Sequence, residues 1–401
     1  MSLANFHKIF STEENFLIRL MQHELQNGKS FTEFTFPENI NEEGLISLIE
    51  RHRLIPTAYN QIKKFSDTPP DFTRRLHELY EKNTRKMLEL ASETARLFTI
   101  FDNEKIPFIA LKGPTFSKLC YGDFNQRQSR DIDLLIQPDK LKQIELMLKK
   151  AGYKRVSPDI GLTPKQYRVN QKGTHEYSFM HPQSGNLIEV HWRLFTSPMQ
   201  LPISENDLFD HAGTFEVAGK KIQVLNPQHR LLYLLVHGSV HNWFRLFWLR
   251  DIGHLIKKND VDLGQLLEDS AKYGVKRSAV QGLILCKILF KSDIPENIVN
   301  EYNHSSLLQK LVKNSITAML SKEGRSTTSK IERMHRPFYL MRLRKEWKYK
   351  MSCIYKLRTN ATDWKTIKLP DGLFFLYTIL RPFTWFYNAY LKKKAGEGEK
   401  R

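Results

Sequence analysis

The chain has 401 residues, more than one compact domain usually contains, so two or three domains are expected. Hydrophobic residues make up 41% of it and aromatic residues 11%, which is enough apolar surface for a folded core and excludes a wholly disordered chain. The formal net charge of +19 favours a polyanionic partner, namely nucleic acid, anionic lipid or a phosphorylated substrate.

Residues 1–94 are predicted to form an N-terminal helical region. Apolar residues recur at helical spacing around Phe16 and again around Leu45. The stretch from Phe72 to Phe101 contains neither Gly nor Pro and places leucines on one face, which predicts one long amphipathic helix.

Residues 95–228 are predicted to form a mixed α/β core. The apolar run before Lys112 predicts a strand that ends in a turn at Gly113. Alternation of helical and extended patterns then continues to about residue 192. Strands are expected at 106–111, 132–136, 176–180 and 187–192, and helices at 115–121 and 138–151.

Residues 229–325 are predicted to be helical again, and residues 321–329 have the composition of a linker. The remainder, residues 326–401, is a basic, aromatic-rich tail. From Lys330 onward there are 18 Lys or Arg against 6 Asp or Glu, so this tail carries +12 of the net charge. The expected fold class is therefore α+β, with a small mixed-sheet core flanked by N-terminal and C-terminal helical regions.

Three carboxylates are the strongest candidates for chemistry. Asp131 and Asp133 alternate along a predicted strand, so both side chains point to one face. Like charges placed together favour a cation between them, and hard oxygen ligands suit magnesium. Glu189, on another predicted strand, completes the set if the two strands pair. The alternative is that the two aspartates are the exposed face of an edge strand.

Several blocks occur in a fixed order over roughly residues 40–260. They are Leu111-Lys112-Gly113, Tyr121-Gly122-Asp123, Arg127, Asp131 to Ile136, Glu189 to Trp192, His237, and Arg245 to Asp251. Together these blocks resemble the uncharacterised nucleotidyltransferase family of the polymerase-beta-type superfamily. The resemblance implies a small catalytic domain, two magnesium ions, and transfer of a nucleoside monophosphate from a triphosphate; it does not name the acceptor.

Five residues are candidates for nucleotide binding: Lys112, Gly113, Arg127, Ser129 and His191. Glycine lets a phosphate approach the backbone, and Lys and Arg donate to phosphate oxygens. The alternatives are a plain turn glycine, a solvated lysine and a hydrogen-bonded core histidine. The wider superfamily usually has Gly-Ser or Gly-Gly in this loop, whereas this chain has Lys112-Gly113-Pro114. Gly113 lies 18 residues before Asp131.

Other residues have two interpretations each. His237 and His241 lie one helical turn apart, which suits a metal pair or ordinary packing. Arg245 and Asp251 belong to the family-like block and either clamp the nucleotide or tie helices together.

The tail has three interpretations. Aromatic segments before Lys392-Lys393-Lys394 suit an interfacial helix on anionic lipid, but Arg381-Pro382 is expected to interrupt a single membrane-spanning helix. The basic residues around Trp347 and Tyr349 equally suit RNA phosphates and stacked bases. A packed C-terminal hairpin with a solvated lysine tail is the third possibility.

These observations favour a magnesium-dependent nucleotidyltransferase, with Asp131, Asp133 and Glu189 as catalytic residues and metal ligands. The expected partners are a nucleoside triphosphate, an unknown hydroxyl acceptor, and an anionic membrane or RNA through residues 330–401; no obligate protein partner is indicated. The alternatives are an inactive nucleotide- or RNA-binding module and a membrane-surface adaptor. Three scattered cysteines and an N-terminus without a signal-peptide pattern predict a cytoplasmic protein, at most peripheral at the inner membrane surface.

Overall fold

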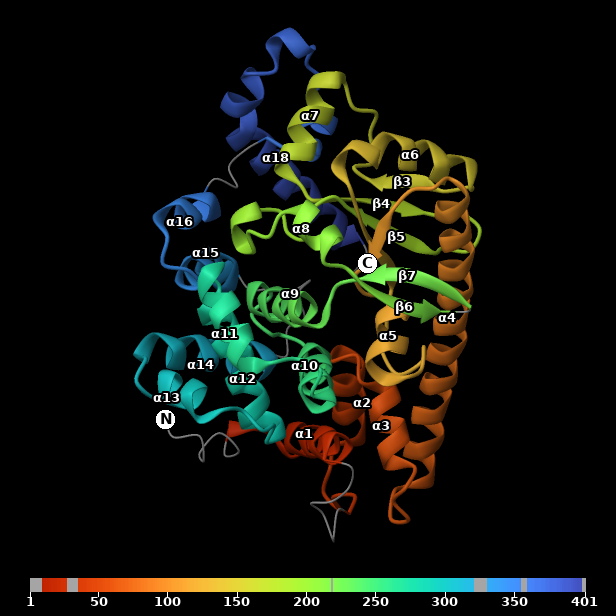
Figure 1. Ribbon diagram of the computed structural model, residues 1–401, viewed down its shortest axis with the longest axis vertical. Helices are drawn as coiled ribbons and strands as arrows, with labels where there is room; N and C mark the ends of the chain where they lie inside the picture. Colours follow the sequence, from red (N-terminus) through yellow and green to blue (C-terminus); the bar gives the residue numbers. More distant parts are fainter. Residues whose placement is uncertain (1–8, 27–34, 218, 321–329, 355–358, 399–401) are drawn as a thin grey trace.

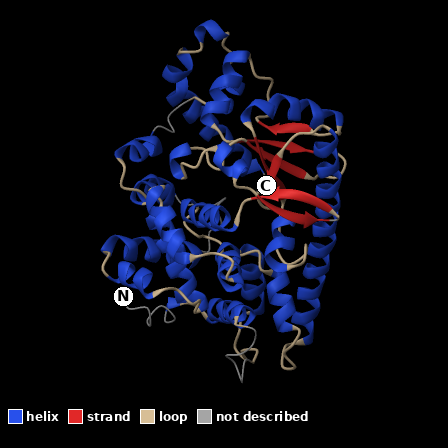
Figure 2. Cartoon of the chain, in the orientation of Figure 1, coloured by secondary structure: helices blue, strands red, loops and turns tan. Residues whose placement is uncertain are grey.

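The computed structural model describes residues 9–26, 35–217, 219–320, 330–354 and 359–398. The predicted linker at 321–329 lies outside these residues. Helices make up most of the molecule, and the strands form one sheet on one side of it (Figure 2).

A seven-stranded mixed sheet has the strand order β3-β4-β5-β2-β1-β7-β6. Its central strand, β2, pairs parallel with β5 and antiparallel with β1, and β1 pairs parallel with β7. The strands are β1 (Phe108–Ala110), β2 (Asp131–Ile136), β3 (Lys154–Ser157), β4 (Glu176–Met180), β5 (Leu187–His191), β6 (Gly213–Val217) and β7 (Lys220–Val224). The four predicted strands are confirmed, and β3, β6 and β7 are additional.

One face of the sheet packs on the long helix α4 (Pro70–Asn103) and on α6 (Leu141–Lys150). Figure 1 shows α4 running along one side of the molecule, beside the strands and on to the level of α3. Alternation along β2 sends Ile132, Leu134 and Ile136 into this core, because every second side chain of a strand points to the same face. The predicted long helix is therefore confirmed, and it covers the sheet.

The opposite face of the sheet meets a larger helical core. Leu135 of β2 and Ile109 of β1 belong to it. The first three helices and the helices after the sheet share this single core, so segments far apart in sequence pack together. These helices are α1 (Thr12–Leu25), α2 (Glu42–Arg51), α3 (Ile55–Ile62), α9 (Pro227–Val240), α10 (Leu246–Lys258), α11 (Leu263–Lys272), α12 (Lys276–Phe290), α13 (Glu296–Asn303) and α14 (Ser306–Leu320).

Three shorter helices lie between the strands: α5 (Pro114–Tyr121), α7 (Pro164–Gly173) and α8 (Glu205–Asp210). The predicted helices at 115–121 and 138–151 correspond to α5 and α6, which confirms both. The later helices are α15 (Lys330–Arg342), α16 (Trp347–Ile354), α17 (Ala361–Thr366) and α18 (Leu376–Gly398).

The C-terminal segment packs onto the rest of the protein. Tyr339 and Leu343 belong to the helical core, and the Tyr339 hydroxyl donates to the carbonyl oxygen of Ser239 over 2.8 Å. A separate small core contains Trp364 and Tyr377 together with Leu162 from the segment before α7. Removing this segment would therefore expose apolar surface on both cores.

The prediction that Arg381-Pro382 interrupts the tail helix is wrong. Helix α18 continues through Pro382, which lies on the exposed side, as does Thr378 four residues earlier. Water can therefore satisfy the carbonyl group that loses its helical hydrogen bond. Among the helices of the described residues, none is both long and apolar enough to cross a bilayer.

Candidate active site

The carboxylates of β2 face the helical side of the sheet. Ile132 and Leu134 point into the core under α4, so Asp131 and Asp133 point the other way, on the side of Leu135. Asp133 is 3% exposed and Asp131 is half-buried. The apolar half of the strand thus anchors the polar half beside the helices.

The parallel pairing of β2 with β5 brings the third carboxylate beside them. In this register Asp133 is the partner of Glu189, and Leu135 is the partner of His191. Carboxylate oxygens of Asp133 and Glu189 and a ring nitrogen of His191 all lie within 4.8 Å of one another. Asp131 is not part of this group among the described residues.

His191 lies among three carboxylates. Its Nε2 lies 3.2 Å from Oδ1 of Asp133 and 3.7 Å from Oε2 of Glu189. Its Nδ1 lies 3.3 Å from Oε2 of Glu176 but makes no well-directed hydrogen bond there. The ring is 3% exposed, so it holds Asp133 in one orientation.

The carboxylates repel one another. Burial and the neighbouring charges of Asp133, Glu176 and Asp131 raise the pKa of Glu189 to about 9. Burial and Asp133 also raise the pKa of Asp131. A divalent cation relieves this repulsion, and oxygen donors at such short separation are the ligands that magnesium takes, so the residues fit a metal site.

Lys112 is the positive group closest to the carboxylates. Its Nζ lies 3.6 Å from Oδ1 of Asp133 and 5.6 Å from the ring centre of Tyr233. Burial lowers the pKa of Lys112, but Asp133, Tyr233 and Asp131 together raise it above its usual value. For Asp133, burial raises the pKa, but Lys112 and His191 hold it below its usual value. The lysine is therefore charged and directed at the aspartates.

Position 113 requires glycine because two backbone segments come very close to each other there. Its φ is +78°, a conformation that side chains rarely adopt, and a Cβ there would lie 2.9 Å from the carbonyl oxygen of Asp131. The turn before α5 thus packs directly against the first residue of β2.

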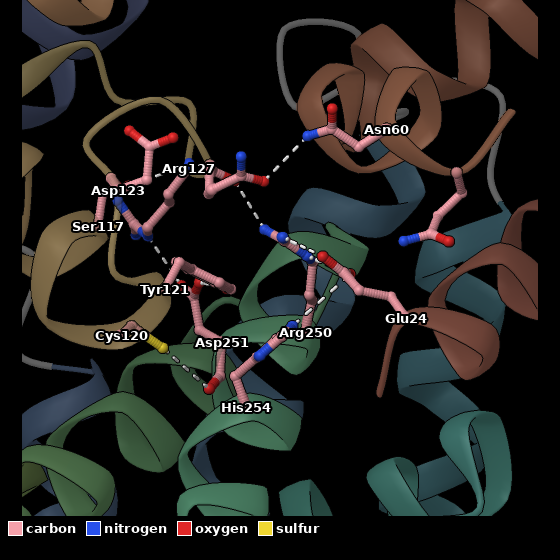
Figure 3. Close-up of polar contacts among 12 residues, drawn as sticks. Glu24, Asn60, Ser117, Cys120, Tyr121, Asp123, Arg127, Arg250, Asp251 and His254 are labelled. Carbon is pink, nitrogen blue, oxygen red and sulfur yellow. Dashed lines mark hydrogen bonds and ion pairs between the residues drawn. The ribbon is translucent and has the colours of Figure 1, made fainter. Parts of the chain in front are cut away.

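Arg127 is buried within the protein. Its Nε lies 2.9 Å from Oδ2 of Asp251, and its Nη1 donates to Oγ of Ser129 over 3.1 Å. The guanidinium lies between the rings of Phe116 and Phe247. Figure 3 shows Arg127 directed at Asp251 on α10. This geometry ties the segment before β2 to the helical region.

A second buried ion pair extends this polar cluster (Figure 3). Nε of Arg250 lies 2.7 Å from Oε2 of Glu24. Its Nη1 donates to the carbonyl oxygen of Gln126 over 2.8 Å. The hydroxyl of Tyr121 lies 2.5 Å from Oδ1 of Asp251. Helix α1, the 121–127 segment and α10 are thus joined behind the carboxylates.

A model of an uncharacterised nucleotidyltransferase family matches residues 38–291, well over half of the chain. The chain belongs to this family. An antigenic nucleotidyltransferase-like protein from Paracoccidioides brasiliensis, solved as a crystal structure, is 18% identical; the alignment covers 53% of this chain and 97% of that one, with a TM-score of 0.33. No curated protein matches the sequence.

Three arginines form a further group within the part of the chain that the family model matches. Sequence reasoning identified this group only in part. Arg53 follows α2, Arg130 precedes β2 and Arg245 precedes α10. Burial, Arg245 and Arg130 lower the pKa of Arg53 to about 9, whereas Asp131 raises it. Burial and then Arg130 lower the pKa of Arg245. Mutual repulsion of this kind favours an anion between the arginines.

The three arginines form no ion pair within the described residues, whereas Arg127 and Arg250 do. Only Arg245 belonged to a recognised sequence block. No spacing relates positions so far apart in the chain, so their grouping is a property of the fold.

His237 and His241, which the sequence suggested as a metal pair, do not belong to the carboxylate group. The rings of His237 and His241 are 4.5 Å apart, and His241 stacks on Trp248 at 5.4 Å. Neither joins a metal-ligand group within the described residues. This arrangement is aromatic packing.

Proposed function

We propose that this protein is a magnesium-dependent nucleotidyltransferase that transfers a nucleoside monophosphate from a nucleoside triphosphate to a hydroxyl group. Its family membership supports nucleotidyl transfer in general. The observation that carries the proposal is the parallel pairing of β2 with β5, which brings Asp133 and Glu189 together beside Lys112. The arginines around Arg53 add a second group, in which like charges repel and Asp131 raises the pKa of Arg53.

A triphosphate with its magnesium relieves both repulsions at once. The cation reduces the repulsion among the carboxylates, and the phosphate oxygens reduce that among Arg53, Arg130 and Arg245. A bare metal ion would relieve only the carboxylates, and a nucleic-acid phosphate alone would relieve only the arginines. The pairing of the two groups across Asp131 therefore favours a metal–nucleotide complex.

Each residue has a proposed role. Asp131, Asp133 and Glu189 would hold magnesium, which when bound supplies charge stabilisation at the reacting phosphate. His191 and Lys112 keep Asp133 oriented. In the reaction the acceptor oxygen forms a bond to the α-phosphorus, the bond from that phosphorus to the bridging oxygen breaks, and pyrophosphate leaves.

The remaining nucleotide-binding candidates divide into two kinds. We propose that Gly113 sets the backbone next to Asp131, and that Arg127 and Ser129 act by fixing the segment that leads to β2. The arginines without ion pairs are the proposed phosphate ligands. The acceptor hydroxyl would lose its proton to a carboxylate of the site, for which Glu189 is the candidate.

Calorimetry with each nucleoside triphosphate in the presence of magnesium tests this proposal directly. We expect binding of at least one triphosphate that requires magnesium and is lost in Asp133→Asn. The matched control is Asp139→Asn, whose side chain is 70% exposed. Binding of no triphosphate, or unchanged binding in Asp133→Asn, would contradict the proposal.

One further observation favours a second activity at the membrane surface. Phe375, the residue before α18, is strongly exposed, and so are Ile379, Phe383 and Phe386 of α18. Each of these four side chains is 61–69% exposed. Their spacing of four, four and three residues puts them on one helical face. The run Lys392-Lys393-Lys394 follows within the same helix. We propose that this face lies on an anionic bilayer, with its aromatics in the interface and its lysines near the headgroups.

The RNA interpretation of the tail has less support in the geometry. Tyr349 is 1% exposed and cannot stack on a base. Arg344 bonds to the carbonyl of Met199 and to Glu346, and of the pair Trp347 and Tyr349 it is Trp347 that has an exposed ring. The exposed aromatics are concentrated on α18.

A further inference from the structure

A cavity of about 740 Å³ lies beside the carboxylates. One wall comes from the sheet region, with Asn170, Thr174 and Glu176 among its residues. The other wall comes from the C-terminal segment, with Ser352 and Thr362 among its residues. A cavity of this size is in the range that holds a small molecule.

Two side chains, Glu176 and His191, connect this cavity to the candidate active site. Glu176 lines the cavity, and its Oε2 lies 3.3 Å from Nδ1 of His191. The other ring nitrogen of His191 lies 3.2 Å from Oδ1 of Asp133. A ligand in the cavity therefore lies two side chains away from Asp133.

The lining of the cavity is close to electrically neutral. Its acidic residues are Asp159 and Glu176, and its basic residues are Lys172 and Lys365; Asp159 and Lys365 pair with each other. In a chain with a net charge of +19, such a balance does not favour a polyanion in this cavity.

Hydroxyl and amide groups supply most of the remaining polar lining. Such groups donate and accept hydrogen bonds, as the hydroxyl groups of a neutral polyol do. Apolar side chains, among them Val169, Leu340 and Trp364, supply the rest of the lining. Sugar-like molecules, whose rings present apolar faces between their hydroxyl groups, therefore match this surface. The polar side chains include Asn170, Thr174, Ser197, Ser352, Asn360 and Thr362.

The two walls also differ in their relation to the family. The family match ends at residue 291, so Asn170 and Thr174 lie within it, whereas Ser352, Asn360 and Thr362 lie beyond it. The nucleotide side of the site thus belongs to the shared part of the chain. The outer wall belongs to a segment that the family model does not include.

We infer that this cavity binds the acceptor, and that the acceptor is a neutral, polyhydroxylated molecule of the glycoside class. The role of acceptor rests on the proposed nucleotidyl transfer. Binding of a glycoside in the cavity does not require a nucleotide. The residues of α16 and α17 that line the cavity then determine which glycoside enters, and Glu176 marks the end of the cavity nearest the candidate active site.

The test uses the full chain and saturation-transfer NMR without nucleotide. The probes are methyl α-D-glucopyranoside, methyl α-D-mannopyranoside and methyl α-D-galactopyranoside, with glucose 6-phosphate and an octauridylate as charged comparisons. We expect transfer to at least one methyl glycoside and weaker transfer to the charged probes. Lys172→Trp and Thr362→Trp fill the cavity from opposite walls and should each weaken glycoside binding about tenfold or more.

Thr99→Trp on α4 is the matched control, because Thr99 is exposed and does not line the cavity. The same samples are titrated with magnesium and the tightest-binding triphosphate, so that failure of the nucleotide site is seen separately. Glycoside binding that persists in both cavity variants, or no glycoside binding in the unmodified chain, would overturn the inference. Preferential binding of octauridylate that both variants abolish would assign the cavity to RNA instead.

Discussion

Nε of Arg127 lies 2.9 Å from Oδ2 of Asp251, although 124 residues separate them in the chain. Both side chains are buried, with 6% and 1% exposed. Asp251 also receives the hydroxyl of Tyr121 at Oδ1. One aspartate of α10 thus fixes two points of the segment that leads into β2, so the orientation of β2 depends on the helical region.

We therefore expect Asp251→Ala to destabilise the protein by about 3 to 5 kcal/mol, because it leaves a buried guanidinium without its counter-charge. The measurement is the free energy of unfolding from urea titration followed by circular dichroism. Asp139→Ala, at an exposed position, should change it by less than about 0.5 kcal/mol. A loss in Asp251→Ala as small as that of the control would show that the ion pair does not support the fold.

The carboxylates of β2 and the partner of Arg127 show how far the sequence could predict the site. Alternation along 131–136 and 187–191 was enough to put Asp131 and Asp133 on one face and to suggest Glu189 beside them, because the period of a strand is local information. The partner of Arg127 was not local. An offset of four residues from Asp131 suggested a phosphate ligand, but the three-dimensional fold supplied Asp251 and buried the pair.

The missed strands have a similar explanation. β6 has Glu216 between its apolar residues, and β7 begins with Lys220 and Lys221, so neither has the apolar run that identified β2. Their place in the sheet depends on pairing with each other and on the parallel pairing of β7 with β1. Pairing across more than a hundred residues leaves no trace in a local pattern.

Glu189→Gln separates the proposed catalytic role of this residue from its structural role. Burial and three neighbouring carboxylates make a charge at this position unfavourable in the metal-free protein. The amide keeps the shape and removes the charge, so the melting temperature should not fall. Pyrophosphate release should nevertheless fall about 100-fold or more, because a metal ligand is lost. A marked loss of stability together with normal turnover would reverse this assignment.

Arg53→Gln and Arg245→Gln should act in opposite directions on stability and on affinity. Each removes a repelling charge, so the nucleotide-free protein should be at least as stable as the unmodified one. Each also removes a charge-assisted donor to phosphate, which should weaken triphosphate binding about tenfold. Thermal unfolding with and without magnesium triphosphate measures both effects. Arg74→Gln, at a 65% exposed position, is the control and should change neither.

Such an outcome would distinguish a binding site from a structural cluster. If the arginines held the fold together, their removal would lower the melting temperature before any ligand was added. Equal triphosphate affinity in both variants would remove them from the nucleotide site.

The pair of Glu24 with Arg250 predicts a specific pH dependence of stability. Burial raises the pKa of Glu24, but Arg250 and His254 together hold it well below its usual value near 4.5. The folded state therefore binds the proton less readily than the unfolded state. The stability from this group is fully present above about pH 5 and declines as pH falls below 4.5, by at most about 1.4 kcal/mol per pH unit.

Glu24→Gln isolates this contribution. The variant should be less stable than the unmodified chain at pH 7, and the difference between them should shrink as pH falls from 5 to 3. Buried neutral His52 also lowers stability in acid, since burial lowers its pKa to about 3, but it does so equally in both proteins. A difference that stays constant over this range would contradict a depressed pKa at Glu24.

The aromatic face of α18 gives the last prediction. Replacing Phe375, Phe383 and Phe386 together by Ser should reduce flotation with anionic vesicles at least about tenfold, because the apolar area available to the interface is removed. Point variants are needed because truncation before α15 would remove Tyr339 and Leu343 and expose the helical core that they cover.

The matched control is Leu88→Ser with Leu146→Ser, which removes exposed apolar residues from α4 and α6 instead. The unmodified chain should also float less with neutral phosphatidylcholine vesicles and at high salt, because lysines near the headgroups contribute through charge. If the triple variant floats as well as the control, α18 does not contact the bilayer. Its aromatics would then have to be covered by protein, which crosslinking of the full chain would detect as a change in oligomeric state between the unmodified protein and the triple variant.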